Sequence, residues 1–494
     1  MPPSVTELRK TDWLLFLVVF AVSVLVHLPG LGLWPMVNHD EVVLNDAAWH
    51  LASEGTVAMP LLVEKDPSYA TSYLWHPPAH MLTMALVYTV TGLSIYATRG
   101  VSLAFAALAV SLCFLVTRRL SGSLGAGLLA AFFLLSHPLW IWLARSGRMD
   151  PAAVCFGLLA LLVVLPGAAE AHEARGLSDR RALLAGALLG IGSMYHLLLL
   201  AWAPALGCAL LAIHRKRAWR PIVLLGLASG VPAAAWLAWV WASGQWQAWV
   251  DQFWVYQVLQ RSSHTPFFLR PWKELRLFLE DFSHWPFVAA AVVTGFVAWV
   301  RSCPKLTRAP LAAGFLVSLA IVVFVMAKGT GAYPMVWFVW MAIAAGIGWQ
   351  RVLMKQRWAR LLLGAAVLNF AGGLAVYNVF ASLQADARSQ QRLATFLQAH
   401  LRPHSIVLGL EETWYGVQKA HCELHIWAKP DPLKQDYVIV PLNKHLSVAP
   451  GFHEVASLPD IMPRFFGHTG WFTDCAYNLW ESNLRAQRAR PARP

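Results

Sequence analysis

The chain has 494 residues, of which 57% are hydrophobic and only 13% are charged, and its mean hydropathy is +0.51. A soluble globular protein carries about twice that share of charged residues, so this composition excludes a soluble enzyme. The net charge of +13 does not indicate nucleic-acid binding, because the basic residues lie in short clusters between apolar runs, as in cytoplasmic loops of membrane proteins.

Apolar runs long enough to cross a bilayer recur along most of the chain. A membrane helix needs about 20 predominantly apolar residues to cross a hydrocarbon core of about 30 Å. The runs lie at residues 13–29, 78–95, 100–117, 122–144, 151–169, 182–213, 221–243, 285–300, 309–327, 331–350 and 361–381. The run at 182–213 is long enough for two helices, with Gly190, Gly192 and Pro204 as candidate breakers. We therefore expect an all-α polytopic membrane protein with about 11 to 13 membrane helices.

Basic clusters predict the orientation of these helices. The clusters are Arg9/Lys10, Arg118/Arg119, Arg175 with Arg180/Arg181, His214 to Arg217, Arg301 to Arg308 and Arg351 to Arg360. If all of them are cytoplasmic, residues 30–77, residues 244–284 and the chain after residue 381 lie outside. The run at 78–95 then cannot cross once while Arg9 and Arg118 both stay inside. Either it enters the membrane without crossing or Arg118 lies outside, and we favour the former because adjacent arginines are costly to translocate.

The composition changes after residue 381 to that of a small soluble domain. Residues 390–400 predict a helix, and residues 405–410 and 437–442 predict short strands. Residues 1–381 are therefore expected to form the transmembrane domain and residues 382–494 a small α/β domain outside the membrane. Cys422 and Cys475 in this region could form a disulfide if the compartment is oxidising.

The first outer loop, residues 30–77, contains an acidic pair. Asp40 and Glu41 open a stretch whose small and apolar residues recur with a helical period up to Gly55, as in a helix lying along the membrane surface. Two adjacent carboxylates at the mouth of a membrane cavity suit a reaction that needs a general base or a metal ion. The alternative is that Asp40 only caps this helix, which is a common role for aspartate.

A second carboxylate, Asp150, lies where a later apolar run begins. If it faces Asp40 across a cavity, the two could hold a divalent cation together with His39 or His76. Oxygen ligands favour Mg²⁺ or Mn²⁺, and histidine ligands favour Zn²⁺. The alternative is that Asp150 caps the helix that follows it.

The order of these motifs resembles that of the GT-C membrane glycosyltransferases, closest to the branch of protein O-mannosyltransferases and lipid A aminoarabinose transferases. The resemblance covers roughly residues 10 to 380. It rests on Asp40-Glu41, Ala47-Ala48, SEGTVAMP at 53–60, His76-Pro77-Pro78, LARSGRMDP at 143–151 and Lys328 to Pro334. It implies inverting transfer of a sugar from a polyprenyl-phosphate donor to an acceptor outside the membrane, with Asp40 and Glu41 catalytic. Aminoarabinose transferases commonly have a lysine before the Pro-Pro pair, whereas this chain has His76.

Several basic or aromatic residues are candidates for binding the donor phosphate. A departing phosphate is an anion and needs positive charge more than a proton. The candidates are His76, Arg145, Arg148, Arg270, Lys328 and Tyr333. Arg145 and Arg148 could instead anchor the chain at the membrane interface, and Lys328 and Tyr333 could be snorkelling and aromatic-belt residues.

We therefore expect a polyprenyl-phosphate-sugar-dependent glycosyltransferase in the cytoplasmic membrane, with its site and C-terminal domain on the periplasmic side. Asp40 would remove the proton of the acceptor hydroxyl, with Glu41 and Asp150 as further catalytic residues. Lipid A, a protein or a glycan would serve as acceptor. The alternative function is a secondary transporter or lipid flippase, but such proteins place ionisable groups near the bilayer midplane, whereas here they gather at the ends of the apolar runs.

Overall fold

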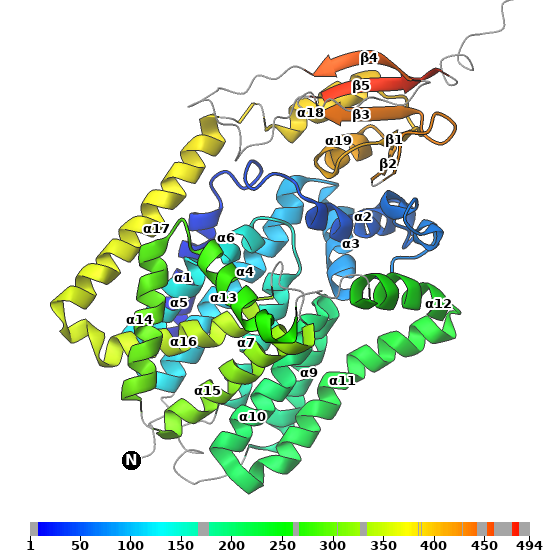
Figure 1. Ribbon diagram of the computed structural model, residues 1–494. Coiled ribbons are helices and arrows are strands. Elements are labelled where there is room, and N and C mark those ends of the chain that lie inside the picture. Colours follow the sequence, from blue (N-terminus) through cyan, green and yellow to red (C-terminus); the bar gives the residue numbers. More distant parts are fainter. Residues whose placement is uncertain are drawn as a thin grey trace, which may run out of the picture.

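Long apolar helices run side by side beneath a small C-terminal sheet (Figure 1). The computed structural model describes residues 8–165, 177–259, 266–303, 305–326, 333–383, 385–386, 388–426, 428–441, 452–458 and 477–483. Within these ranges, seven helical segments are long and apolar enough to cross a membrane. They are Lys10–His27 (α1), Ile95–Ser121 (α4), Leu197–His214 (α10 with the turn before it), Trp219–Ala242 (α11), Arg308–Met326 (beginning within α15, Lys305–Ala320), Met335–Lys355 (α16, Met335–Arg351, with the turn after it) and Arg357–Leu383 (α17).

Other apolar helices fill the places of the remaining predicted runs. The run at 122–144 forms two helices, α5 (Leu124–Leu135) and α6 (Pro138–Ala144), which are bent by 72° relative to each other. Three further apolar helices are shorter: α3 (Ala79–Thr91), α7 (Asp150–Val164) and α14 (Pro286–Ser302). The chain is therefore a multi-pass, all-α membrane protein up to the end of α17, as the hydropathy predicts.

The run at 182–213 forms two helices, as expected, but it breaks at a different residue. The first helix, α9 (Asp179–Tyr195), ends before His196, and α10 (Trp202–His214) follows a short 3-10 turn. Gly190 and Gly192 lie inside α9, where a Cβ would come within 2.8 Å of Pro232 and 2.3 Å of Leu199, respectively. These glycines therefore permit close helix packing rather than breaking the helix.

An ion pair settles the path of the chain between α1 and α4. Asp12, near the start of α1, accepts a hydrogen bond from Nε of Arg118, near the end of α4, at 3.0 Å. The start of α1 and the end of α4 therefore lie at the same end of the bundle, and the end of α1 and the start of α4 lie at the other. The chain between α1 and α4, which includes α3, thus begins and ends at that second end. Since α3 has 13 residues, about 20 Å at 1.5 Å per residue, it is too short to cross, in agreement with the favoured prediction.

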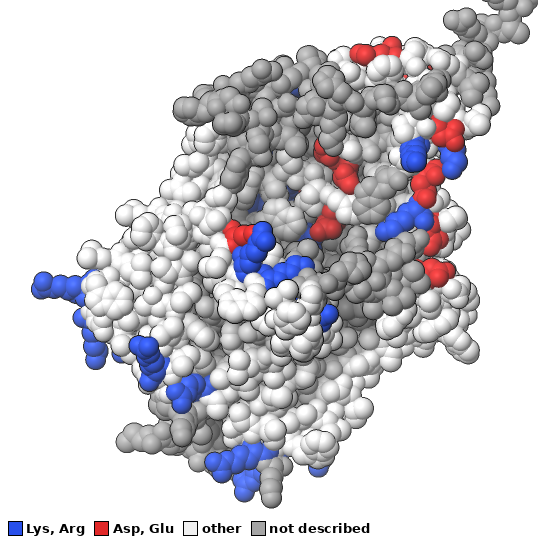
Figure 2. All heavy atoms as spheres, viewed as in Figure 1, with Lys and Arg blue, Asp and Glu red and all other residues white. Residues whose placement is uncertain are grey.

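Charge is distributed unequally between the two ends of the helices. Among the described residues in view in Figure 2, the end farthest from the C-terminal sheet carries Lys and Arg but no Asp or Glu, whereas the half nearer the sheet carries side chains of both signs. The predicted basic loops follow α4, α10, α14 and α16 and precede α9. The basic clusters therefore share one end of the bundle, as the orientation argument requires.

The two predicted outer loops contain helices and contact each other. Residues 30–77 include α2 (His39–Glu54) and two 3-10 turns, Pro60–Leu62 and Pro67–Ala70; residues 244–284 include α12 (Trp246–Trp249), a π-helical continuation (Val250–Leu259) and α13 (Arg270–Asp281). The buried Gln252 accepts a hydrogen bond from the Leu74 N–H at 2.7 Å and donates one to the Ser72 carbonyl at 2.9 Å. One side chain thus joins the two loops.

The C-terminal part is a small α/β unit. It contains α18 (Gln390–His400), β1 (Ile406–Leu408), α19 (Trp414–Lys419), β2 (Glu423–His425), β3 (Tyr437–Pro441), β4 (Phe452–Leu458) and β5 (Tyr477–Ser482). The sheet order is β2-β1-β3-β5-β4, with β1 parallel to β2 and β3 and with β5 antiparallel to β3 and β4. The predicted helix and both predicted strands are present. Cys475 lies outside the described residues, so its pairing with Cys422 stays a prediction.

The C-terminal part shares a hydrophobic core with the first outer loop. Buried apolar residues from 37 to 95, including Val42 and Tyr69, pack in one cluster with residues from 393 to 479, including Trp414 and Leu479. A separate cluster fills the membrane bundle. The C-terminal unit is therefore built into the outer loop rather than attached to it by a linker alone.

Candidate active site

The helix α2 carries the acidic pair, and residues next to each end of the helix define where it begins and ends. The Asn38 side chain accepts a hydrogen bond from the Glu41 N–H at 3.1 Å, and Gly55, with φ of 72°, ends the helix. Asp40 is therefore not the cap. The expected surface helix is instead largely buried, including its polar residues Asn45 and Asp46, because α3 and the C-terminal part cover it.

Asp40, Arg148 and Asp150 form one charged cluster. The Arg148 Nε donates a hydrogen bond to Oδ2 of Asp150 at 2.7 Å, and its Nη1 donates one to Oδ2 of Asp40. Asp150 is the first residue of α7 and follows Met149, which is the N-cap residue of that helix. The structure thus brings together three of the predicted site residues, from α2, from the α6–α7 turn and from α7.

The three residues of this cluster differ in solvent exposure and in charge. The side chains of Arg148 and Asp150 are 8% and 3% exposed, whereas that of Asp40 is 44% exposed. Burial by itself would lower the pKa of Arg148. The adjacent carboxylates of Asp150 and Asp40 raise this pKa by more than burial lowers it, so the net shift is upward. Arg148 is therefore a permanent cation, and Asp40 is the carboxylate in this cluster that solvent or a substrate can reach.

Histidines extend the cluster along one side. The His196 Nε2 lies 3.7 Å from Oδ1 of Asp150. Its ring centroid is 6.0 Å from that of His76 and 6.2 Å from that of Tyr333, two of the predicted phosphate ligands. His196 is not among the residues that the sequence predicts for the site, although it lies in the long apolar run at 182–213, at the break between α9 and α10.

Tyr73 is a further residue that sequence reasoning missed. It is 4% exposed, its ring lies 6.4 Å from that of His76, and its hydroxyl has no hydrogen-bond partner within the described ranges. Burial raises the pKa of Tyr73 well above its usual value, and Tyr69 and Asp40 raise it further. The hydroxyl therefore stays protonated and can donate a hydrogen bond to a bound group.

An apolar crevice opens beside Asp150 and His196. It is lined by residues of α7, of α10 with its preceding turn, and of α16: Ala153, Val154, Leu198, Leu199, Trp202, Met335 and Val336. The charged cluster thus lies at the edge of a small hydrophobic crevice between helices.

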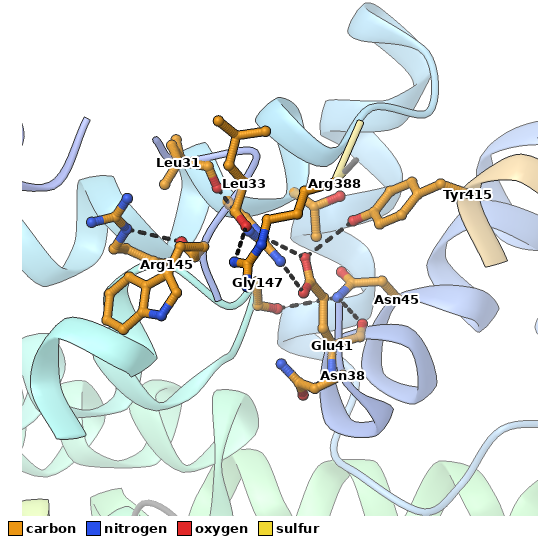
Figure 3. A network of polar contacts seen from close by, with 12 residues as sticks. Leu31, Leu33, Asn38, Glu41, Asn45, Arg145, Gly147, Arg388 and Tyr415 are labelled. Atoms are coloured by element: carbon orange, nitrogen blue, oxygen red, sulfur yellow. Dashed lines mark hydrogen bonds and ion pairs between the residues drawn. The ribbon is translucent and has the colours of Figure 1, made fainter. Parts of the chain in front are cut away.

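Glu41 is not placed to contact a substrate, which differs from its expected catalytic role (Figure 3). It is fully buried, and Arg99 of α4, also fully buried, donates from Nε to Oε1 at 2.9 Å and from Nη2 to Oε2 at 2.8 Å. The Tyr415 hydroxyl donates to Oε1 at 3.3 Å. Both carboxylate oxygens are occupied by protein donors. The sequence could not reveal this, because Arg99 lies 58 residues away in an apolar helix.

Arg145 also has a structural role rather than the expected phosphate contact. It is fully buried, and it donates to the carbonyl oxygens of Trp34 at 3.1 Å and Pro29 at 2.5 Å, with its guanidinium over the Trp34 ring. It therefore holds the start of the first outer loop.

Two phosphate candidates remain, Arg270 and Lys328. Arg270 donates to the Phe324 carbonyl at 3.1 Å and lies over the Phe267 ring, so it joins α13 to the π-helical turn 321–326. Lys328 lies outside the described residues. Of the six predicted phosphate ligands, Arg148 contacts Asp150 directly. His76 and Tyr333 lie near His196, which in turn lies near Asp150.

The predicted divalent cation does not fit the arrangement of its proposed ligands. The Arg148 guanidinium lies between Asp40 and Asp150, where a cation would have to bind. His39 is paired with Glu411, with Nδ1 and Oε1 3.2 Å apart. Within the part of the chain that the structure describes, no group of three or more His, Cys, Asp or Glu residues is placed to hold a metal ion. The positive charge between the two carboxylates is that of Arg148.

No protein-family model and no curated protein matches the sequence. The fold, however, is similar to the crystal structure of ArnT from Cupriavidus metallidurans bound to undecaprenyl phosphate, with a TM-score of 0.66 over 98% of this chain and 100% of that chain at 17% identity. The chain therefore has the GT-C fold. The apo structure of the same transferase matches with a TM-score of 0.62 over 98% of this chain and 99% of that chain, also at 17% identity.

The oligosaccharyltransferase AglB from Archaeoglobus fulgidus, in complex with an inhibitory peptide and a dolichol-phosphate, matches more weakly. Its TM-score is 0.48 at 12% identity, over 87% of this chain and 70% of that chain. In the GT-C fold of the present chain, the Asp40 cluster lies where α7, α10 and α16 begin and α9 ends, on the side that carries the C-terminal sheet.

Proposed function

We propose that this protein is a glycosyltransferase that moves a sugar from a polyprenyl-phosphate donor to an acceptor, with inversion at the anomeric carbon. The observation that carries the proposal is the reachable carboxylate of Asp40, held by the buried Arg148-Asp150 pair at the edge of an apolar crevice. The GT-C fold supports it. A transporter is less well supported, because the cluster lies at helix ends rather than midway along the helices.

In this reaction Asp40 is the general base. The acceptor hydroxyl loses its proton to Asp40 as its oxygen attacks the anomeric carbon, and the bond between that carbon and the donor phosphate breaks on the opposite face. Arg148 and Asp150 hold Asp40 in place, so that the base needs no reorganisation during the reaction.

The leaving group is a lipid phosphate, and the cluster offers it several donors. Arg148 supplies a permanent positive charge. The His196 ring lies beside Asp150, and the rings of His76 and Tyr333 lie near His196, so all three can supply hydrogen-bond donors or acceptors. Lys328 lies outside the described residues, so its contact with the donor phosphate stays a prediction. The ArnT structure of similar fold contains undecaprenyl phosphate, which is the donor carrier that we propose here.

The acceptor is a hydroxyl or phosphate of lipid A, a protein or a glycan, on the periplasmic side of the cytoplasmic membrane. The basic clusters at the end opposite the sheet support this orientation, because basic loops favour the cytoplasmic side. This side is also where a lipid-linked donor would replace nucleotide sugars.

The proposal is tested with the purified full-length protein in detergent and a polyprenyl-phosphate-linked sugar. Wild-type protein should release polyprenyl phosphate and form a glycosylated acceptor, and Asp40→Asn should lower kcat by about 10²- to 10⁴-fold. Glu54→Gln is the matched control, because Glu54 lies on the same helix with a side chain that is 57% exposed, and it should leave kcat unchanged. Wild-type rates in the Asp40→Asn variant would refute the assignment of the base.

A further inference from the structure

One turn of the C-terminal part contacts α2 on both sides of Asp40. Glu411 pairs with His39, with the carboxylate oxygen 3.2 Å from Nδ1. The Tyr415 hydroxyl donates to Glu41 at 3.3 Å, and the Trp414 Nε1 donates to Oδ1 of Asp46 at 2.7 Å. The turn 411–415 therefore binds the residue before Asp40, the residue after it, and the next turn of the helix.

These contacts are interior contacts rather than a surface docking. Trp414, Tyr415, Glu41 and Asp46 are each at most 1% exposed. Burial, followed by the charge of Glu41, raises the pKa of Tyr415 well above its usual value, so its hydroxyl stays protonated and donates. A buried carboxylate that loses such a donor is left partly unsatisfied, so each contact strongly favours one position of α2.

The membrane bundle holds the same turn of α2 from the other side. Arg99 of α4 binds both oxygens of Glu41, and the Asn45 side chain donates to the Gly147 carbonyl at 3.1 Å, in the turn that carries Arg148. Figure 3 shows Tyr415 and Gly147 approaching α2 from opposite directions. Asp40 thus lies on a helix that contacts the α6–α7 turn on one side and the C-terminal part on the other.

We propose that Tyr415 and Trp414 are positioning residues: the C-terminal part sets the location of Asp40 relative to Arg148 by holding α2. The proposal rests on the function assigned to Asp40 above. It assigns the C-terminal part a role in the transfer step itself, because a base displaced by about 1 Å can cost up to 100-fold in rate.

The test compares two tyrosine-to-phenylalanine variants of the full-length protein. Tyr415→Phe removes the hydroxyl that reaches α2. Tyr437→Phe is the matched control, because the buried Tyr437 hydroxyl also donates to a carboxylate, Oε1 of Glu481, at 3.2 Å, but within the C-terminal sheet. Amide hydrogen exchange of residues 36–48 and steady-state kinetics are measured for both.

We expect Tyr415→Phe to speed exchange in residues 36–48 and to lower kcat about tenfold with little change in the donor KM, while Tyr437→Phe changes neither. Unchanged exchange in α2, or equal effects of the two variants, would overturn the proposal. The exchange measurement does not depend on the reaction. If the wild-type protein transfers no sugar, the proposed function fails, and the exchange data still decide whether Tyr415 holds α2.

Discussion

The buried pair of Arg99 and Glu41 allows a direct test of whether Glu41 is structural or catalytic. Arg99 makes two hydrogen bonds to the Glu41 carboxylate and a third, from Nη1 to the Leu31 carbonyl at 2.7 Å, and both charged side chains are 0% exposed. Removing one member of such a pair leaves an uncompensated buried charge, at a cost of about 3–5 kcal/mol. Arg99→Met and Glu41→Gln should each destabilise the fold by about that amount.

The double variant Glu41→Gln/Arg99→Met removes both charges and keeps a side-chain oxygen that can accept from Tyr415. Because no buried charge is left unpaired, the double variant should recover at least half of the stability that either single variant loses. Tryptophan fluorescence during thermal unfolding in detergent measures this, and each single variant should lower the melting temperature by several degrees.

A matched control comes from an exposed pair. Arg276 and Glu280 form an ion pair on α13 with side chains that are 79% and 52% exposed, so Glu280→Gln/Arg276→Met should change stability by less than about 1 kcal/mol. Losses that simply add in the double variant at Arg99 and Glu41 would refute the compensation argument. If the double variant recovers stability but transfers no sugar, Glu41 acts on the substrate and its structural assignment is wrong.

Three further predictions concern stability, pH and orientation. Arg145→Met leaves the carbonyl oxygens at residues 29 and 34 without their donor and should lower the melting temperature, whereas the donor KM should stay unchanged in kinetic assays. Burial, with help from Glu280 and Glu274, raises the pKa of Asp281 to about 6; because the folded-state pKa lies above the unfolded value, this contribution to stability is present below about pH 4 and is lost as the pH rises through about 6. Asp281→Asn should therefore raise stability at pH 7.5 by about 1–2 kcal/mol and leave it unchanged at pH 4, as thermal unfolding at both pH values will reveal. In a cysteine-free background, Ser53→Cys should react with a membrane-impermeant thiol reagent added outside cells and Arg217→Cys should not, and the reverse pattern would overturn the orientation.

Local signals in the sequence were sufficient for most of the elements. The apolar runs predict the membrane helices because hydropathy and length act within a single segment, and Gly55 ends α2 through its own backbone conformation. The acidic pair and LARSGRMDP were found for the same reason: charge is scarce in this chain, so each charged residue beside an apolar run is informative. The break at His196 was misplaced because glycines in membrane helices often serve packing, and only the neighbouring helix α11 shows which role Gly190 has.

The division of roles among the charged residues required the tertiary structure. Asp40 and Glu41 are adjacent in sequence, yet they point to different surroundings, and the difference depends on which helix face meets α4 and which meets the α6–α7 turn. Arg99, Tyr415 and Trp414 are ordinary residues of an apolar helix and a soluble region when viewed in sequence. Their partners lie 58, 374 and 368 residues away.

The scarcity of charge, at 13% of 494 residues, therefore determined by itself that the protein crosses the membrane many times and that its polar residues gather at the helix ends, because transfer of charge into hydrocarbon is unfavourable for any fold. Only the tertiary structure decided which of those charges compensate each other. Arg99 neutralises Glu41 and Arg148 joins Asp40 to Asp150, because ion pairing depends on distances of a few ångströms between segments that the sequence does not place.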